Sequence, residues 1–212
     1  MNSVFSYNTD ITRNAYLNWR TDKYDQAHNL SILASDYSDG AISLINAILE
    51  DNRDKKADSL IMPIMYCIDQ SIEVYLKAII RRIESLTGST TSVYKTHDIK
   101  ELLNIMIAQI KKKETKTKGL QKHVLPLTKF IDELYSKIQT TDEDGKGSLG
   151  IDFARYPIKA DGTPHFYVTA GECVVIDVEN LGNRFIEIRD CLESLYLMFD
   201  AEAEVMENLK TQ

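Results

Sequence analysis

The sequence predicts a mainly α-helical protein: a bundle of about five helices with a small antiparallel β excursion, at about residues 152–178, before the last helix. Apolar residues recur at intervals of three and four through most of the chain, which is the periodicity of a helix with one buried face. The 212 residues include only nine glycines and four prolines, and 43% of the chain is hydrophobic, as in a globular protein. We therefore expect a single domain over residues 1–212, with a helical core at about 25–140 and 180–209 and a loop and β insertion at about 141–178.

The first two predicted helices carry apolar stripes over residues 24–52 and 56–86. Gly40 lies in the middle of the first and marks a kink or a close contact with another helix. Pro63 lacks the N–H that a helix interior uses, so the regular part of the second helix is expected to begin near this residue. Gly88 follows the stripe at the position typical of a helix end.

Two shorter helices and one long helix complete the predicted bundle. Residues 99–110 form the third, and the fourth begins after Gly119 and runs to about residue 138. Pro126 lies within the fourth pattern and predicts a kink or a later start. The last helix covers about residues 180–209 and is amphipathic along its whole length.

The pattern changes between the fourth and the last helix. Residues 139–150 are hydrophilic, and the segment IDFARYPI that follows alternates between apolar and polar positions. Asp161-Gly162 is typical of a turn, and residues 165–178 are rich in β-branched and aromatic side chains. Together these features predict two or three short antiparallel strands.

Charge and targeting features limit the classes of function. The formal net charge of −7 argues against a surface covered with basic residues for nucleic acid. The charge is uneven, because residues 111–122 contain six lysines, whereas acidic residues predominate after residue 186. No apolar run approaches the roughly 20 residues of a membrane span, and the start of the chain lacks the features of a secretory signal. We expect a cytoplasmic protein that does not bind membranes.

The sequence contains no motif for a metal or a cofactor. Cys67, Cys173 and Cys191 are widely spaced in apolar surroundings and resemble small buried hydrophobic residues. A glycine-rich phosphate loop, a dinucleotide fingerprint, a cysteine-pair metal site and a calcium loop are all missing from the sequence. We therefore predict no metal site and no cofactor.

Two groups of polar residues are candidates for function. On the second helix, Glu73 precedes Lys77 by four residues and forms either a solvated ion pair or part of a polar groove facing a ligand or a second subunit. In the segment KTHDIKEL, Asp98 and Glu101 have the spacing of a helix-start box. His97, beside that start, is either an uncharged, packed and hydrogen-bonded residue or a group that transfers protons.

These two groups resemble the core motifs of the HEPN (higher eukaryotes and prokaryotes nucleotide-binding) superfamily. Its members have a helix with a Glu, three residues and Lys-Ala, followed after a loop by His-Asp and leucines. The matching residues in this chain are Glu73, Lys77, Ala78, His97, Asp98, Leu102 and Leu103. Asp152 with Arg155-Tyr156-Pro157 resembles a segment that precedes the last helix in a bacterial subgroup. The resemblance covers about residues 25–205.

The resemblance implies an α-helical bundle that forms a homodimer and binds nucleotide, RNA or a partner protein, in phage defence or a toxin–antitoxin-type system. It implies ligand-binding roles for Glu73, Lys77, His97, Asp98, Asp152, Arg155 and Tyr156. Nuclease members of the superfamily cut RNA without metal, using an Arg followed after four to six residues by a His. None of the four histidines of this chain has an Arg at that spacing.

Three functions therefore remain open for a protein that we expect not to be an enzyme. The first is binding of RNA, a nucleotide or a partner protein. The second is metal-independent cleavage of RNA at a nonlocal site, for which His97, Arg155 and His165 are the candidates. The third is a purely structural role as a helical subunit of an assembly. Arg155-Tyr156-Pro157 accordingly either stabilises a turn or contacts a ligand.

Overall fold

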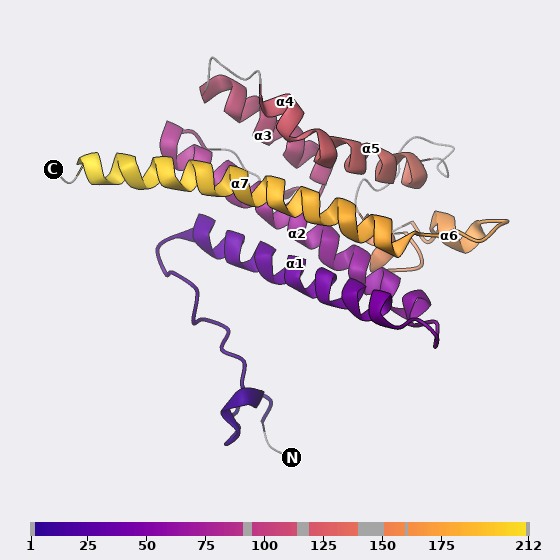
Figure 1. The fold of residues 1–212 in the computed structure, drawn as a ribbon. Coiled ribbons are helices and arrows are strands. Elements are labelled where there is room, and N and C mark those ends of the chain that lie inside the picture. Colours follow the sequence, from indigo (N-terminus) through magenta and orange to yellow (C-terminus); the bar gives the residue numbers. More distant parts are fainter. Residues whose placement is uncertain (1–2, 91–94, 114–118, 140–150, 160, 211–212) are drawn as a thin grey trace.

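The computed structural model describes residues 3–90, 95–113, 119–139, 151–159 and 161–210 and confirms the helical bundle (Figure 1). Five long helices form it, as the periodicity predicts: α1 (Gln26–Glu50), α2 (Lys56–Thr87), α3 (Ile99–Lys113), α5 (Leu125–Gln139) and α7 (Val178–Lys210). Shorter turns of helix lie in the connections: η1 (Ile11–Arg13), α4 (Leu120–His123), η3 (Ile151–Ala154) and α6 (Phe166–Thr169). Within the described ranges, no helix has both the length and the apolar character needed to cross a bilayer.

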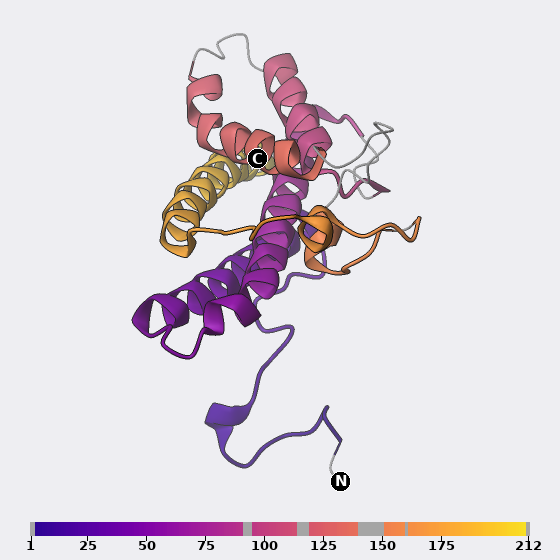
Figure 2. The same cartoon turned by 90° about the vertical axis from the view of Figure 1, so that its right-hand side faces the viewer.

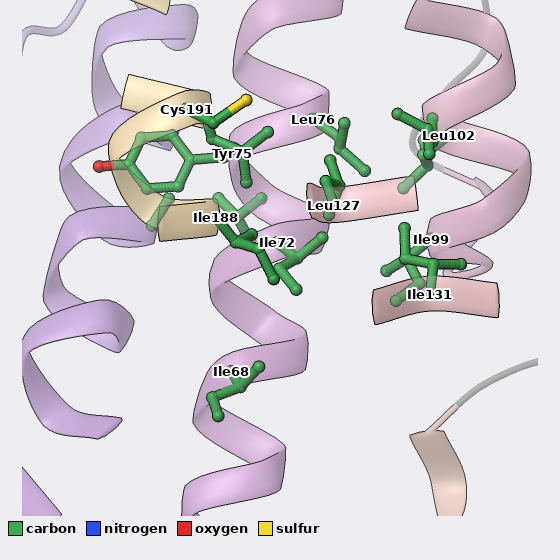
Figure 3. Packing of buried hydrophobic residues seen from close by; sticks show 14 of the residues in the cluster. Ile68, Ile72, Tyr75, Leu76, Ile99, Leu102, Leu127, Ile131, Ile188 and Cys191 are labelled. Atoms are coloured by element: carbon green, nitrogen blue, oxygen red, sulfur yellow. The ribbon is translucent and has the colours of Figure 1, made fainter. Parts of the chain in front are cut away.

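Helix α2 lies at the centre of the bundle. It packs against α1 and α7 on one side and against α3 on the other, and α5 joins α3 to α7 (Figures 1 and 2). Figure 3 shows side chains of α2 pointing both ways, with Leu76 toward Leu102 and Leu127 and Tyr75 toward Cys191. Because neighbours surround α2, its polar flank is covered as well as its apolar stripe.

The start of α2 differs from the expectation. The helix begins at Lys56 and continues through Pro63, so the predicted start near Pro63 is wrong. The Asn52 side chain accepts a hydrogen bond from the N–H of Ala57 at 2.9 Å, which satisfies one donor of the first turn. Ser59 and Pro63 are both exposed, so water can reach the carbonyl group that the proline leaves without its helical partner.

The other helix boundaries follow the residues that predict them. Gly88 adopts a left-handed conformation (φ 68°) and ends α2, where its N–H donates to the carbonyl of Glu84. The chain breaks its helix at Val124, and Pro126 is the second residue of α5, which confirms the later start. The predicted loop after Gln139, residues 140–150, lies outside the described residues, as do residues 114–118 of the lysine-rich stretch.

The β excursion is a wrong prediction. The described part of residues 152–178 contains one isolated antiparallel bridge, between Ile158 and Pro164, and Phe166–Thr169 is helical. The turn at Gly162 does form, with φ 85° and a backbone hydrogen bond to Lys159. Residues 170–177 run outside any helix or strand, and Val175 is 83% exposed. Strand-forming residues give a sheet only when a neighbouring strand supplies hydrogen bonds and packing, and none lies beside this described segment.

Two helical glycines differ in the space around them, and this difference gives the first testable prediction. A Cβ on Gly40 would lie 3.9 Å from Cys67 Sγ, an ordinary contact, whereas one on Gly182 would lie 3.0 Å from Ile45 Cγ2. We expect Gly40→Ala to raise the free energy of unfolding by up to about 1 kcal/mol, because alanine favours helix. Gly182→Ala should gain less, because Ile45 has to move. Urea unfolding of both variants checks this, and a less stable Gly40→Ala would contradict it.

Candidate functional site

Glu73 and Lys77 form an ion pair inside the bundle. Lys77 Nζ lies 2.7 Å from Glu73 Oε1, and the two side chains are only 5% and 7% exposed. Of the two alternatives that the sequence left open for these residues, the solvated ion pair is therefore wrong. The sequence pattern of one helix shows that α2 has a polar flank. It does not show that α3 and η3 also pack against this helix.

His97 extends this pair to the start of α3. Its Nδ1 lies 3.0 Å from Glu73 Oε1, within hydrogen-bonding distance of this carboxyl group. The His97 side chain is 75% exposed, so the residue is hydrogen-bonded as expected but is not packed. The buried carboxylate thus fixes the orientation of an imidazole that faces solvent.

Asp98 is the cap of α3, as the sequence predicts. Its Oδ1 accepts hydrogen bonds from the backbone N–H groups of Lys100 at 2.8 Å and Glu101 at 3.1 Å. Glu101 accepts a hydrogen bond from Thr96 Oγ1, which in turn accepts one from the N–H of Asp98. In the predicted helix-start box, Glu101 is therefore connected to the N–H of Asp98 through the Thr96 hydroxyl group.

Tyr135 and Asp69 belong to the same group, although no role was predicted for them. Tyr135 Oη donates to Asp98 Oδ1 at 2.7 Å, and burial together with this carboxylate raises the pKa of the phenol. Asp69 lies one helical turn before Glu73 and is only 6% exposed, and its Oδ1 has no hydrogen-bond partner within the described ranges. We call Asp69, Glu73, Lys77, His97, Asp98 and Tyr135 the polar cluster.

The carboxyl group of Asp69 has a pKa well above its ordinary range. Burial raises the pKa of its carboxyl group to about 8, and the negative charge of Glu73 adds to this effect. Asp152 raises the pKa of Asp69 further, whereas the positive charge of Arg155 lowers it. Because the charges of Asp152 and Arg155 both act on Asp69, the segment that carries them lies beside the same stretch of α2. This agrees with the packing of η3 on this helix.

The Arg155-Tyr156-Pro157 segment forms a turn. The N–H groups of Arg155 and Tyr156 both donate to the carbonyl of Asp152, and Arg155 Nη1 lies 3.9 Å from Asp152 Oδ1. The Arg155 guanidinium also lies over the Tyr156 ring, 5.4 Å from its centroid. About half of the Arg155 side chain is exposed, so it stabilises the turn and remains accessible to a ligand.

His165 is separate from the accessible residues. It is buried, stacks on Tyr167 with ring centroids 6.4 Å apart, and lies edge-on to Phe153 at 6.5 Å. Of the three catalytic candidates, His97 of the polar cluster and Arg155 beside this cluster are thus exposed, whereas His165 is buried among aromatic side chains. In the part of the chain that the structure describes, no set of three His, Cys, Asp or Glu side chains is arranged to hold a metal ion.

Two shallow hollows lie away from the polar cluster. One, of about 790 Å³, is lined by the connection between α1 and α2 and by the start of α7. The other, of about 630 Å³, lies between α4, the start of α5 and the middle of α7.

Comparison of the chain with models of protein families, with curated proteins and with solved structures found no match. The polar cluster and its surroundings are therefore the basis for a functional proposal.

Proposed function

We propose that the chain is a HEPN-like protein that binds RNA or a nucleotide without cutting it, through His97 of the polar cluster and Arg155 beside this cluster. The observation that supports this most is the hydrogen bond between His97 and the buried Glu73. It holds an exposed imidazole in one orientation, so that the ring loses little conformational freedom when it binds a phosphate or a base. The exposed guanidinium of Arg155 supplies a positive charge for phosphate.

Binding is favoured over cleavage because the lysine of the polar cluster is not available to stabilise the charge on a reacting phosphate. Lys77 is buried and already paired with Glu73, so it neutralises the carboxylate inside the bundle. Arg155 is partly neutralised by Asp152. Metal-independent cleavage needs a proton-transferring group together with stabilisation of the charge that develops on the phosphate.

One observation favours ribonuclease activity as the second candidate function. A buried carboxylate on Nδ1 of an exposed histidine is the arrangement that orients a general base in many hydrolases. The Glu73–His97 pair has this arrangement.

The setting that we propose for either function, a cytoplasmic homodimer in phage defence or a toxin–antitoxin-type system, follows from the sequence resemblance. A partner protein bound at the same surface, or a purely structural role in an assembly, is the alternative when no RNA or nucleotide binds.

Binding is tested by fluorescence anisotropy with a labelled single-stranded RNA and, separately, with a labelled nucleotide at several salt concentrations. We expect wild-type affinity to fall as salt rises, and His97→Ala and Arg155→Ala each to weaken binding about tenfold. Arg155→Ala should also lower the slope of log K against log salt by about 1, because one phosphate contact is lost. The control is Arg53→Ala, an exposed arginine in the α1–α2 connection that pairs with Asp51. Absence of salt-sensitive binding by the wild type would overturn the proposal.

Cleavage is tested by incubating RNA with the protein in EDTA. We expect RNA to stay intact with the wild type, with His97→Ala and with Arg155→Ala. Cleavage by the wild type that His97→Ala abolishes would instead establish the second candidate function.

A further inference from the structure

The connection between α6 and α7, residues 170–177, has the composition of a β-strand but no partner strand among the described residues. It contains Val174, Val175 and Ile176 in succession, and β-branched residues favour strands. Figure 2 shows the connection crossing from α6 to the start of α7, outside any helix. Within the described ranges its backbone forms one hydrogen bond, in which the carbonyl of Asp177 accepts from the first turn of α7. The remaining N–H and C=O groups are open to a partner strand.

The exposure of the side chains varies along this connection as it does in a strand on a protein surface. Val175 is 83% exposed, whereas the flanking Val174 and Ile176 are 48% and 38% exposed. Successive side chains of a strand point to opposite sides, so Val175 faces away from the bundle and its two neighbours face toward it. A strand edge of this kind binds an extended peptide through main-chain hydrogen bonds, and pockets beside the edge select its side chains.

A hollow of about 790 Å³ lies beside the end of this strand-like segment, between the α1–α2 connection and the start of α7. Part of its lining is apolar and includes Leu49, Ile176 and Val178. The charged residues of the lining are five acids and one base: Glu50, Asp51, Asp58, Asp177, Glu179 and Arg53. The hollow is therefore a negatively charged pocket with an apolar wall.

Three of these carboxylates are free to bind a cation. Arg53 is already paired with Asp51 at 2.8 Å. Glu50, Asp58 and Glu179 form no ion pair and no side-chain hydrogen bond with any residue that the structure describes. A lysine or arginine side chain fits this pocket, because its aliphatic stem packs on the apolar wall while its charged end meets the carboxylates.

The charges of the segment itself disfavour a second copy of this chain as the added strand. Antiparallel pairing of two copies about Val174 and Val175 places Glu172 of each opposite Asp177 of the other. Parallel pairing in register places each acidic residue opposite itself. Like charges directly opposite each other destabilise a pair of strands, whereas opposite charges stabilise it. A basic peptide therefore complements both the segment and the adjacent hollow.

We propose that residues 172–177 bind, as an added β-strand, an extended segment of a partner protein that is rich in lysine or arginine and places a cationic side chain in the acidic hollow. Main-chain hydrogen bonds hold the added strand, and the unpaired carboxylates select its charge. The same carboxylates repel RNA, and no residue of the polar cluster takes part. This interaction is therefore separate from the proposed binding of RNA or a nucleotide.

The first test is fluorescence anisotropy with a labelled peptide of alternating lysine and valine, without RNA. We expect saturable binding that weakens as salt rises, and no binding of the matched peptide with glutamate in place of lysine. The lysine peptide methylated at every peptide nitrogen keeps its charges but loses its main-chain donors. It should bind about tenfold more weakly, as expected for the loss of two hydrogen bonds. Equal binding of the methylated peptide, or no saturable binding of the lysine peptide up to about 1 mM, would overturn the proposal.

The second test removes donors from the segment. Val174→Pro/Val175→Pro deletes the N–H groups of two successive residues, one of which points to the outer edge of the strand. We expect the affinity for the lysine peptide to fall by about tenfold or more, with the helical circular dichroism retained because both residues are exposed. Val174→Ala/Val175→Ala keeps both N–H groups and is the matched control, which should retain most of the affinity. A proline variant that binds as tightly as this control would rule out strand addition.

The third test reverses the charge of the hollow. Asp58→Lys/Glu179→Lys should lose the lysine peptide and gain binding of the glutamate peptide. Glu193→Lys/Glu204→Lys changes the net charge by the same amount at two exposed residues of α7 that do not line the hollow. This control should keep its preference for the lysine peptide. If both variants lose that peptide equally, the net charge of the protein and not the hollow attracts it, and the proposal is wrong.

Sedimentation velocity of the wild type and of Val174→Pro/Val175→Pro tests the competing occupant. We expect the two proteins to have the same oligomeric state. A wild-type oligomer that the proline variant dissociates would show that a second copy occupies the strand edge, which would overturn the proposal of a basic partner.

Discussion

Replacing Lys77 with methionine is expected to lower the free energy of unfolding by about 3–5 kcal/mol, because the substitution leaves a buried carboxylate without its cation. Glu73 is 5% exposed and accepts its hydrogen bonds from Lys77 and His97. After the substitution the carboxylate keeps only the bond from His97, and its other oxygen, Oε2, has no partner among the described residues. Urea unfolding at pH 7 measures the loss.

A double variant separates the charge from the packing. In Glu73→Gln/Lys77→Met no buried charge remains, and we expect most of the stability that Lys77→Met loses to return. The matched control is Lys100→Met, which removes an exposed ion pair of 2.8 Å to Asp132, against 2.7 Å for the buried pair. Exposed pairs contribute about 0–1 kcal/mol, so this control should lose little. If Lys77→Met loses no more than Lys100→Met, the ion pair does not stabilise the fold as argued.

The sequence predicts the helices well because local residues decide where they begin and end. Gly88, Asp98 and Pro126 act through their own backbone angles or through side-chain hydrogen bonds to the adjacent turn. The start of α2 was misplaced because Ser59 and Pro63 are exposed, so water can reach the carbonyl group that the proline leaves without its helical partner. The β excursion was wrong because strand formation depends on a neighbouring strand, which a list of residue types does not supply.

The candidate site was predicted in part. Glu73 and Lys77 were chosen from their helical spacing and His97 from its place beside a helix start, and Glu73 does contact both of the others. Tyr135 was missed because a tyrosine in a helical stripe is indistinguishable from an apolar core residue until its hydroxyl finds Asp98. Asp69 is buried because segments that lie far from it in the sequence pack over this part of α2. Helical periodicity alone places Asp69 on the polar flank of the helix and does not show that this flank is buried.

Asp69 should make the stability of the protein fall as pH rises from about 5 to 8. Burial raises its pKa to about 8 in the folded protein, from an ordinary value of 3.8. The folded state therefore binds the proton more tightly than the unfolded chain does. The resulting stabilisation is complete below the unfolded pKa and is lost as pH rises through the folded pKa. Within this window the contribution falls by about 1.4 kcal/mol per pH unit at most.

Asp69→Asn tests this, because the amide has nearly the same shape and does not ionise. We expect the variant and the wild type to have similar free energies of unfolding at pH 5, and the variant to be more stable at pH 9 by on the order of 3 kcal/mol. Asp132→Asn, at an exposed carboxylate, is the control and should leave the pH dependence unchanged. Parallel curves for Asp69→Asn and the wild type would show that Asp69 is ionised in the folded protein at neutral pH. In that case the polar cluster would carry an additional buried negative charge, and binding of a phosphate beside it would be disfavoured.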